Sequence, residues 1–328
     1  MSVDDTKLMK ALRGQPTESV PFWEVWFAMK GLAEHVLGKP IADVADEIAF
    51  AQYMGWEYLR IPVPARHPGS TTATASDGTA HYVPGGRVDL DELYARPDPD
   101  WSAAAETAQE RMKLARAEGM VTIAYLPWAF HAVCTALGLG NFGLLAYDDP
   151  EYISAMFDWV EAGVRLAIAE VVIPLGLDVV LLDGDCAFKN GLMINPRMFR
   201  DLVFERTRDT VAPLREAGII YTLHSDGKAD DLLTLLVELD FSAFHGVEAA
   251  ANDLGDIKRR FGRDITLMGN MDVVFLTHAT VAEVRAATEQ MLTIGMEGGR
   301  YVAACNTSPL DYIPYDNYLA MVDVIWNF

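Results

Sequence analysis

Residues 218–232, GIIYTLHSDGKADDL, carry the pattern on which the fold assignment depends. The stretch opens with an apolar run typical of a buried strand, and His224 and Asp226 follow where the run stops. Near-continuous apolar strands are typical of a parallel sheet that is covered on both faces. Because similar runs alternate with helical patterns along the chain, the stretch indicates one unit of an alternating α/β fold.

Eight segments have the character of strands: 21–27, 58–63, 120–126, 178–184, 218–225, 243–248, 265–270 and 299–305. Helical patterns lie between most of them, and start signals such as Asp149-Pro150, Asn195-Pro196 and the capping box of Thr280 and Glu283 support them. This count favours a (β/α)8 TIM barrel over a doubly wound sheet. No linker rich in Pro, Gly or Ser divides the chain, so we expect residues 1–328 to form a single barrel domain.

Residues 66–99 interrupt this alternation after the second strand. The segment reads as an inserted hairpin with Asp77-Gly78 as its turn. It would serve either as a flap beside the barrel mouth or as a plain surface loop.

The stretch GLGNFG, residues 138–143, matches the dinucleotide-binding pattern G-x-G-x-x-G. That pattern binds a pyrophosphate only when it lies between a strand and the helix that follows it. The residues before it, WAFHAVCTAL, look helical, so we do not expect nucleotide binding here.

The composition excludes several classes of partner. The formal net charge of −21 repels nucleic acid and anionic membrane surfaces. Three widely spaced cysteines do not form a disulfide framework, and a reducing, cytoplasmic setting fits them. The first residues resemble no secretory signal, and no uncharged apolar run approaches the ~20 residues needed to span a bilayer.

Polar residues follow most of the expected strands at the point where each strand ends. They are Glu24, Tyr125 with Trp128, Asp183 with Asp185, His224 with Asp226, His245 with Glu248, Asn270 with Asp272, and Cys305 with Asn306. In a (β/α)8 barrel these ends share one rim, where catalytic residues lie. Buried carboxylates are costly unless they are paired or bind a ligand, so the pattern predicts an enzyme.

His224 and Asp226 share one strand face because residues i and i+2 point the same way. Together with Cys305 at the end of the last strand they would make a three-ligand zinc set with an open fourth position. The alternative is a hydrogen-bonded His–Asp pair and an inert buried thiol.

Other residues at the rim are candidates for catalysis and for substrate binding. Asp183, Asp185 and Glu248 would orient substrate or move protons, although Asp183 and Asp185 could instead cap the following loop. Trp26, Tyr125 and Trp128 would line a pocket for an apolar or aromatic ligand, or belong to the core. Glu24 and Asn270 complete the predicted substrate-binding set.

The chain resembles the uroporphyrinogen decarboxylase superfamily, which also contains cobalamin-linked methyltransferases. The similar segments occur in the same order and spacing: ALRGQPTESVPFWEVW (11–26), LLDGDCAFKNGLMINPRMF (181–199), LHSDGKADDLL (223–233), DIKRRFGRDITLMGNMD (256–272) and GGRYVAACNTSPLDYIPYDNYLAM (298–321). The resemblance implies a (β/α)8 barrel, which agrees with the strand count.

The resemblance also separates the two branches of that superfamily. Porphyrinogen decarboxylases carry an arginine-rich R-Q-A-G-R stretch near the N-terminus, whereas residues 21–31, PFWEVWFAMKG, contain no arginine. The methyltransferase branch binds zinc through H-x-C and a later cysteine. His224 and Cys305 match that pattern, and Asp226 replaces a cysteine, which leaves a harder metal centre.

The sequence therefore predicts a zinc-dependent methyltransferase of the cobalamin-linked type. It would move a methyl group between a small substrate and a corrinoid carried on a partner protein, either as a demethylase of a methoxylated or methylated donor or towards a thiol acceptor. A homo-oligomer is compatible with this prediction. One alternative is a metal-free decarboxylase or lyase of a small acid, which uses Asp183 or His224 as proton donor and Arg66 or Lys189 to hold the carboxylate. Another is a non-catalytic small-molecule binding protein.

Overall fold

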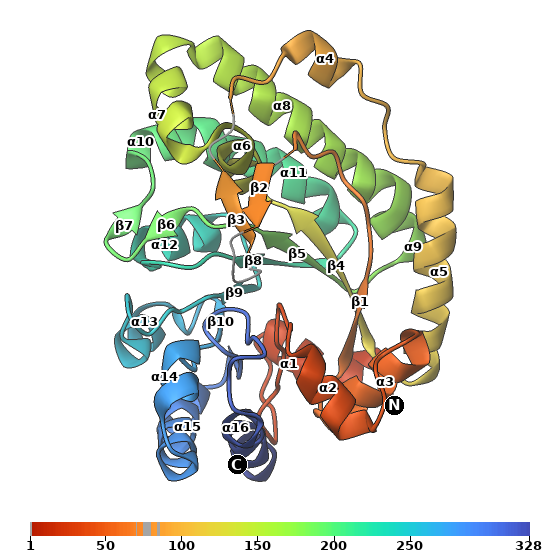
Figure 1. Ribbon diagram of the computed structural model, residues 1–328, viewed down its shortest axis with the longest axis vertical. Coiled ribbons are helices and arrows are strands. Elements are labelled where there is room, and N and C mark those ends of the chain that lie inside the picture. The colour runs from red at the N-terminus through yellow and green to blue at the C-terminus, as the bar shows by residue number, and fades with distance from the viewer. Residues whose placement is uncertain (1, 70, 75–79, 84–85) are drawn as a thin grey trace.

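The computed structural model describes residues 2–69, 71–74, 80–83 and 86–328. Its centre is a curled sheet of seven parallel strands whose spatial order follows the chain order (Figure 1). These strands are β1 (Tyr58–Ile61), β4 (Val121–Pro127), β5 (Val179–Asp183), β8 (Ile220–His224), β9 (Ala243–His245), β10 (Thr266–Met268) and β11 (Tyr301–Val302). The predicted alternating α/β fold is confirmed by this arrangement.

The first predicted strand, residues 21–27, does not form a regular strand. Phe22 makes an isolated parallel bridge to Ala303, where the Trp23 N–H donates to the Ala303 carbonyl at 3.1 Å. On its other side the described residues show no backbone hydrogen bond to β1. The Tyr58 hydroxyl donates instead to the Glu24 carbonyl at 2.6 Å. The observed sheet is therefore a half-barrel of seven strands, because side chains occupy the seam that an eighth strand would close.

The segment 66–99 contains the expected antiparallel pair. Strands β2 (Thr71–Thr74) and β3 (Ala80–Val83) pair with Thr74 opposite Ala80. The predicted turn residues Asp77 and Gly78 lie outside the described residues. Two further short strands, β6 (Ala187–Phe188) and β7 (Gly191–Leu192), form a second hairpin after β5, which the sequence analysis did not predict.

Helices connect and cover the strands (Figure 1). In the first half of the chain they are α1 (Lys7–Leu12), α2 (Lys30–Leu37), α3 (Val44–Tyr53), α4 (Leu90–Tyr94), α5 (Trp101–Ala117), α6 (Ala129–Leu137), α7 (Leu139–Asp148) and α8 (Pro150–Ala167). In the second half they are α9 (Ile173–Leu175), α10 (Pro196–Phe199), α11 (Glu205–Glu216), α12 (Asp230–Glu238), α13 (Leu254–Phe261), α14 (Val273–His278), α15 (Val281–Met296) and α16 (Tyr315–Asn327).

Several local predictions hold in these helices. Asp149 accepts a hydrogen bond from the Tyr152 N–H at the start of α8, and Thr280 forms its capping box with Glu283. Gly138 joins α6 to α7, so GLGNFG follows a helix and not a strand, as expected. Among the described residues no single helix is long and apolar enough to cross a membrane, and only the bent pair α6 and α7 passes that test jointly.

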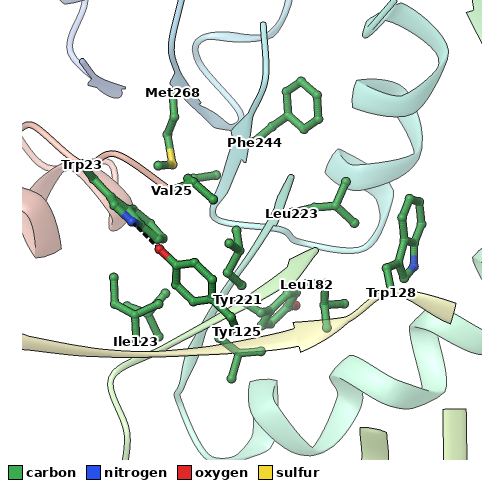
Figure 2. Packing of buried hydrophobic residues seen from close by; sticks show 14 of the residues in the cluster. Trp23, Val25, Ile123, Tyr125, Trp128, Leu182, Tyr221, Leu223, Phe244 and Met268 are labelled. Atoms are coloured by element: carbon green, nitrogen blue, oxygen red, sulfur yellow. Dashed lines mark hydrogen bonds between the residues drawn. The ribbon is translucent and has the colours of Figure 1, made fainter. Parts of the chain in front are cut away.

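The core fills the inside of the curled sheet and the space beneath its helices. Figure 2 shows Trp23 and Tyr125 meeting inside it, with the Trp23 indole N–H donating to the Tyr125 hydroxyl at 3.0 Å. Leu223 and Phe244, from the neighbouring strands β8 and β9, lie within the same cluster. Burying a side chain of this size contributes about 1.5–3 kcal/mol. This packing fixes the strand ends from which the site is built.

Candidate functional site

The strand ends of β5, β8 and β9 lie in register at one rim of the sheet. Asp183 is paired with His224, and His224 is paired with His245. Residues in register on adjacent parallel strands present their side chains to the same face. The predicted polar rim is therefore present on these three strands.

A cluster of two carboxylates and one imidazole lies at this rim. Ligand-type atoms of Asp185, His224 and Asp226 all lie within 4.8 Å of one another. The His224 Nε2 is 3.9 Å from Asp185 Oδ1, and the backbone N–H of Asp226 donates to the same oxygen at 2.9 Å. We call these three residues the rim cluster.

Gly227 allows the loop after β8 to pack closely beside this cluster. Its φ angle is +94°, and a Cβ there would clash with the carbonyl oxygen of Ala187. A side chain would therefore push the loop away from the β6–β7 hairpin. The Gly227 N–H donates to Glu248 Oε2 at 2.9 Å, which gives Glu248 a role in holding the loop.

Asp226 is the least satisfied member of the rim cluster. Its Oδ1 is buried and has no hydrogen-bond partner among the described residues. The pKa of the Asp226 carboxyl is raised to about 6, chiefly by burial; Asp185 and Glu248 also raise it, while His224 and a hydrogen bond from Thr307 lower it. An unpaired buried oxygen beside a second carboxylate is costly unless a cation or a proton lies between them.

His224 is held in one tautomer by a relay of hydrogen bonds. His245 Nε2 lies 3.1 Å from the Cys305 carbonyl, which can only accept, so this nitrogen carries the proton. Burial lowers the pKa of His245 well below its usual value, so its ring is neutral and its Nδ1 accepts. That Nδ1 lies 2.7 Å from His224 Nδ1, which must therefore donate. Nε2 is therefore the His224 atom that remains for a metal or a second proton, and it lies 3.9 Å from Asp185 Oδ1.

The rim cluster fits a divalent cation. It offers one nitrogen lone pair and the oxygens of two carboxylates, one of them unpaired, which is an accepted donor set for zinc. The imidazole behind His224 fixes the orientation of its ring, as outer partners of metal ligands do. The alternative to a cation is a proton on His224 Nε2, which would then donate to the carboxylates.

Cys305 and Glu24 form a separate buried pair. The Cys305 thiol is hydrogen-bonded to the Glu24 carboxyl, and burial raises the pKa of the thiol well above its usual value. The Cys305 N–H also donates to Glu24 Oε2 at 3.1 Å, and the Tyr318 hydroxyl donates to Oε1 at 3.0 Å. The structure thus brings Asp185, and not Cys305, to His224 and Asp226.

The aromatic residues predicted to bind substrate divide into two groups. Trp26 lies edge-on to Tyr125 with ring centroids 5.0 Å apart, and its indole N–H donates to Asp183 Oδ1 at 2.9 Å. This pair is part of the rim. The Trp128 indole N–H instead donates to Thr207 on α11 at 2.9 Å, which places Trp128 in the core between the sheet and that helix.

Two pockets contain the remaining predicted residues. A pocket of about 630 Å³ is lined by Asp185, Asp226, Glu248 and the β6–β7 hairpin with Lys189. Asn270 lies elsewhere, in a pocket of about 440 Å³ that is also lined by Asp272 at the start of α14. Arg66 is bound to Asp98 at 2.6 Å.

Two residues at the rim had no role in the sequence analysis. His245 was noted only as a polar strand end, since nothing in the sequence shows that its ring contacts His224. Arg60 lies in β1 on the same strand face as Tyr58, and an arginine inside the apolar run YLRIPV was the available signal.

Comparisons with known proteins agree with this fold. Residues 94–328, more than two thirds of the chain, match the family model described as uroporphyrinogen decarboxylase (URO-D). Four of the five similar segments lie inside that range, and the segment at 11–26 lies before it. No curated protein matches the chain.

Among solved structures, a methyltransferase from Methanosarcina mazei is similar over 100% of this chain and 99% of its own, with a TM-score of 0.75 and 17% identity. The agreement is weaker for a β-L-arabinopyranosidase from Geobacillus stearothermophilus, with a TM-score of 0.47, 13% identity, and coverage of 96% of this chain and 76% of that chain. At such identities the likeness concerns the fold.

Proposed function

The chain belongs to the uroporphyrinogen decarboxylase family, and we propose that within this family it is a methyltransferase of the cobalamin-linked type. The acidic rim supports this proposal, because Asp183, Asp185, Asp226 and Glu248 would repel the several carboxylates of a porphyrinogen. The methyl group would pass between a small substrate and a corrinoid protein. Closure of the sheet into a full (β/α)8 barrel, one domain over residues 1–328, belongs to the same proposal.

The observation that carries the proposal is the buried Asp226 Oδ1 without a hydrogen-bond partner among the described residues, in a carboxylate that lies with Asp185 and His224 in the rim cluster. We expect Asp185, His224 and Asp226 to hold one zinc ion. When bound, zinc supplies a Lewis acid that stabilises negative charge on the heteroatom of the substrate. His245 keeps the His224 ring in the ligating tautomer, and Asp185 also fixes the Asp226 backbone.

The other rim residues would position the substrate. Asp183 holds the Trp26 ring edge-on to Tyr125, which gives the rim an aromatic wall. Glu248 holds the Gly227 loop at the pocket of about 630 Å³. The harder donor set, with no thiolate in the rim cluster, leads us to favour a methoxylated donor over a thiol acceptor.

The first test is the metal content of protein purified without a histidine tag. We expect about one equivalent of zinc in the wild type and little in His224→Ala or Asp226→Asn. Cys305→Ala should keep its metal, because the thiol lies with Glu24. If the protein binds no metal even after zinc is offered, we would conclude instead that a proton on His224 satisfies the carboxylates of the rim cluster.

A metal-free decarboxylase is the second candidate, and one observation favours it. Lys189 lines the same pocket as Asp185 and Asp226, where it would hold a substrate carboxylate. Arg66 does not line that pocket and is paired with Asp98 instead. Activity on a small acid that survives chelators would support this candidate. A binding protein without catalysis would show no turnover that depends on His224.

A further inference from the structure

Arg60 is a cation held above an aromatic platform at the rim. Its guanidinium lies 4.4 Å from the centroid of the Trp26 ring and 4.6 Å from that of Tyr125. The two rings are nearly perpendicular, at 89°. Contact with aromatic rings stabilises the charge of a guanidinium but supplies no acceptors for its N–H donors.

No acidic partner of Arg60 is found among the described residues, and its side chain takes part in none of their ion pairs or hydrogen bonds. The nearby acids are already engaged. Glu47 is bound to Arg111 at 2.5 Å, and Asp183 accepts from Trp26. Most arginines of this acidic chain are paired with aspartate or glutamate, whereas Arg60 lies against two aromatic rings beside a pocket, and this combination points to an anionic ligand.

Arg60 lines a pocket of about 210 Å³ in the seam between residues 24–27 and β1. The walls are mostly apolar and aromatic, and the two carboxyl groups that also line the pocket are engaged elsewhere, Glu24 with Cys305 and Tyr318 and Glu47 with Arg111. The buried indole N–H of Trp56 has no acceptor among the described residues. A flat apolar ligand with a hydrogen-bond acceptor at one end would fit these walls and donors.

The pocket and the rim cluster are joined through a short chain of contacts. Trp26 lines the pocket and donates to Asp183, and Asp183 is the register partner of His224. A ligand anchored at Arg60 would therefore extend along the same rim towards the rim cluster.

We propose that Arg60 binds the carboxylate of a small aromatic acid, and that such acids are the substrates of this site. The assignment of these acids as substrates rests on the proposed methyltransferase function, whereas the binding itself does not. The backbone of Arg60 and the Tyr125 ring that its guanidinium contacts are already held in place. Arg111 donates to the Arg60 carbonyl at 3.1 Å and Trp23 holds Tyr125, so little freedom is lost when the anion binds.

The test is direct binding, measured by calorimetry with 4-methoxybenzoate and its neutral analogue 4-methoxybenzamide. We expect the wild type to prefer the carboxylate, and Arg60→Gln to weaken carboxylate binding about 10-fold to 100-fold, as for other charge-assisted hydrogen bonds. Binding of the amide should change little. Arg60→Lys keeps the charge but loses the planar fork, and should recover only part of the affinity.

Arg197→Gln is the matched control, because it removes the same charge from an exposed arginine of another pocket. Equal affinity of the wild type for acid and amide, no binding of either, or equal effects of the two glutamine variants would overturn the proposal. The circular dichroism spectrum of Arg60→Gln reports folding separately. Arg60-dependent binding in a protein that binds no zinc would keep the carboxylate site and reject the methyltransferase.

Discussion

Replacing Glu24 by glutamine should remove part of the loss of stability that the protein undergoes as the pH rises. Glu24 is buried between Cys305 and Tyr318, and burial raises its pKa to about 7 against 4.5 for an ordinary glutamate, while its hydrogen bonds oppose the shift. The native protein therefore holds this proton more tightly than the unfolded chain does. Stability from this group is present at low pH and is lost as the pH rises through about 7.

The size of the effect follows from the two pKa values. Between about pH 5 and about pH 8 the wild type should lose about 2.5 kcal/mol of unfolding free energy at this site. Glutamine has nearly the same shape and can still accept a hydrogen bond, but it does not ionise. The difference in stability between Glu24→Gln and wild type should therefore shift by about 2.5 kcal/mol in favour of the variant over that range.

Urea unfolding followed by tryptophan fluorescence at both pH values measures this difference. Glu18→Gln, which changes an exposed glutamate near in sequence, is the control and should show no such shift. A change below about 0.5 kcal/mol, or one of the opposite sign, would refute the reasoning, since it would mean that Glu24 is ionised at both pH values or is not buried.

Three further predictions concern the rim, the core and a helix end. His245→Phe should weaken zinc binding about 10-fold to 100-fold in a chelator competition, because the ring no longer fixes the His224 tautomer, and unchanged affinity would remove that role. Leu223→Ala should lower the unfolding free energy by about 2–5 kcal/mol in urea, since this side chain is fully buried, and a cost below 1 kcal/mol would mean that the site is loosely packed. Thr280→Ala should cost about 1 kcal/mol through loss of the capping box, and no loss in thermal unfolding would contradict the observed cap.

Most of the sheet could be predicted from the sequence because buried parallel strands need continuous apolar runs. Seven of the eight predicted runs became strands. Residues 21–27 are also apolar, yet they form only a bridge at Phe22. Whether such a segment pairs along its length depends on how the neighbouring side chains fill the seam, and Trp23 and Tyr58 pack across it at a centroid distance of 5.6 Å.

The sequence by itself determined that the polar ends of β5, β8 and β9 lie at one rim, because strand ends and the period of two are local properties. His224 and Asp226 could be paired in this way. Only the tertiary structure decided that Asp185 joins them, that the Cys305 thiol lies with Glu24, and that His245 orients His224. These contacts join residues tens to hundreds of positions apart, and the curvature of the sheet and the rotamers of its core select them. Neither the curvature of the sheet nor the rotamers of its core can be read from a local sequence pattern.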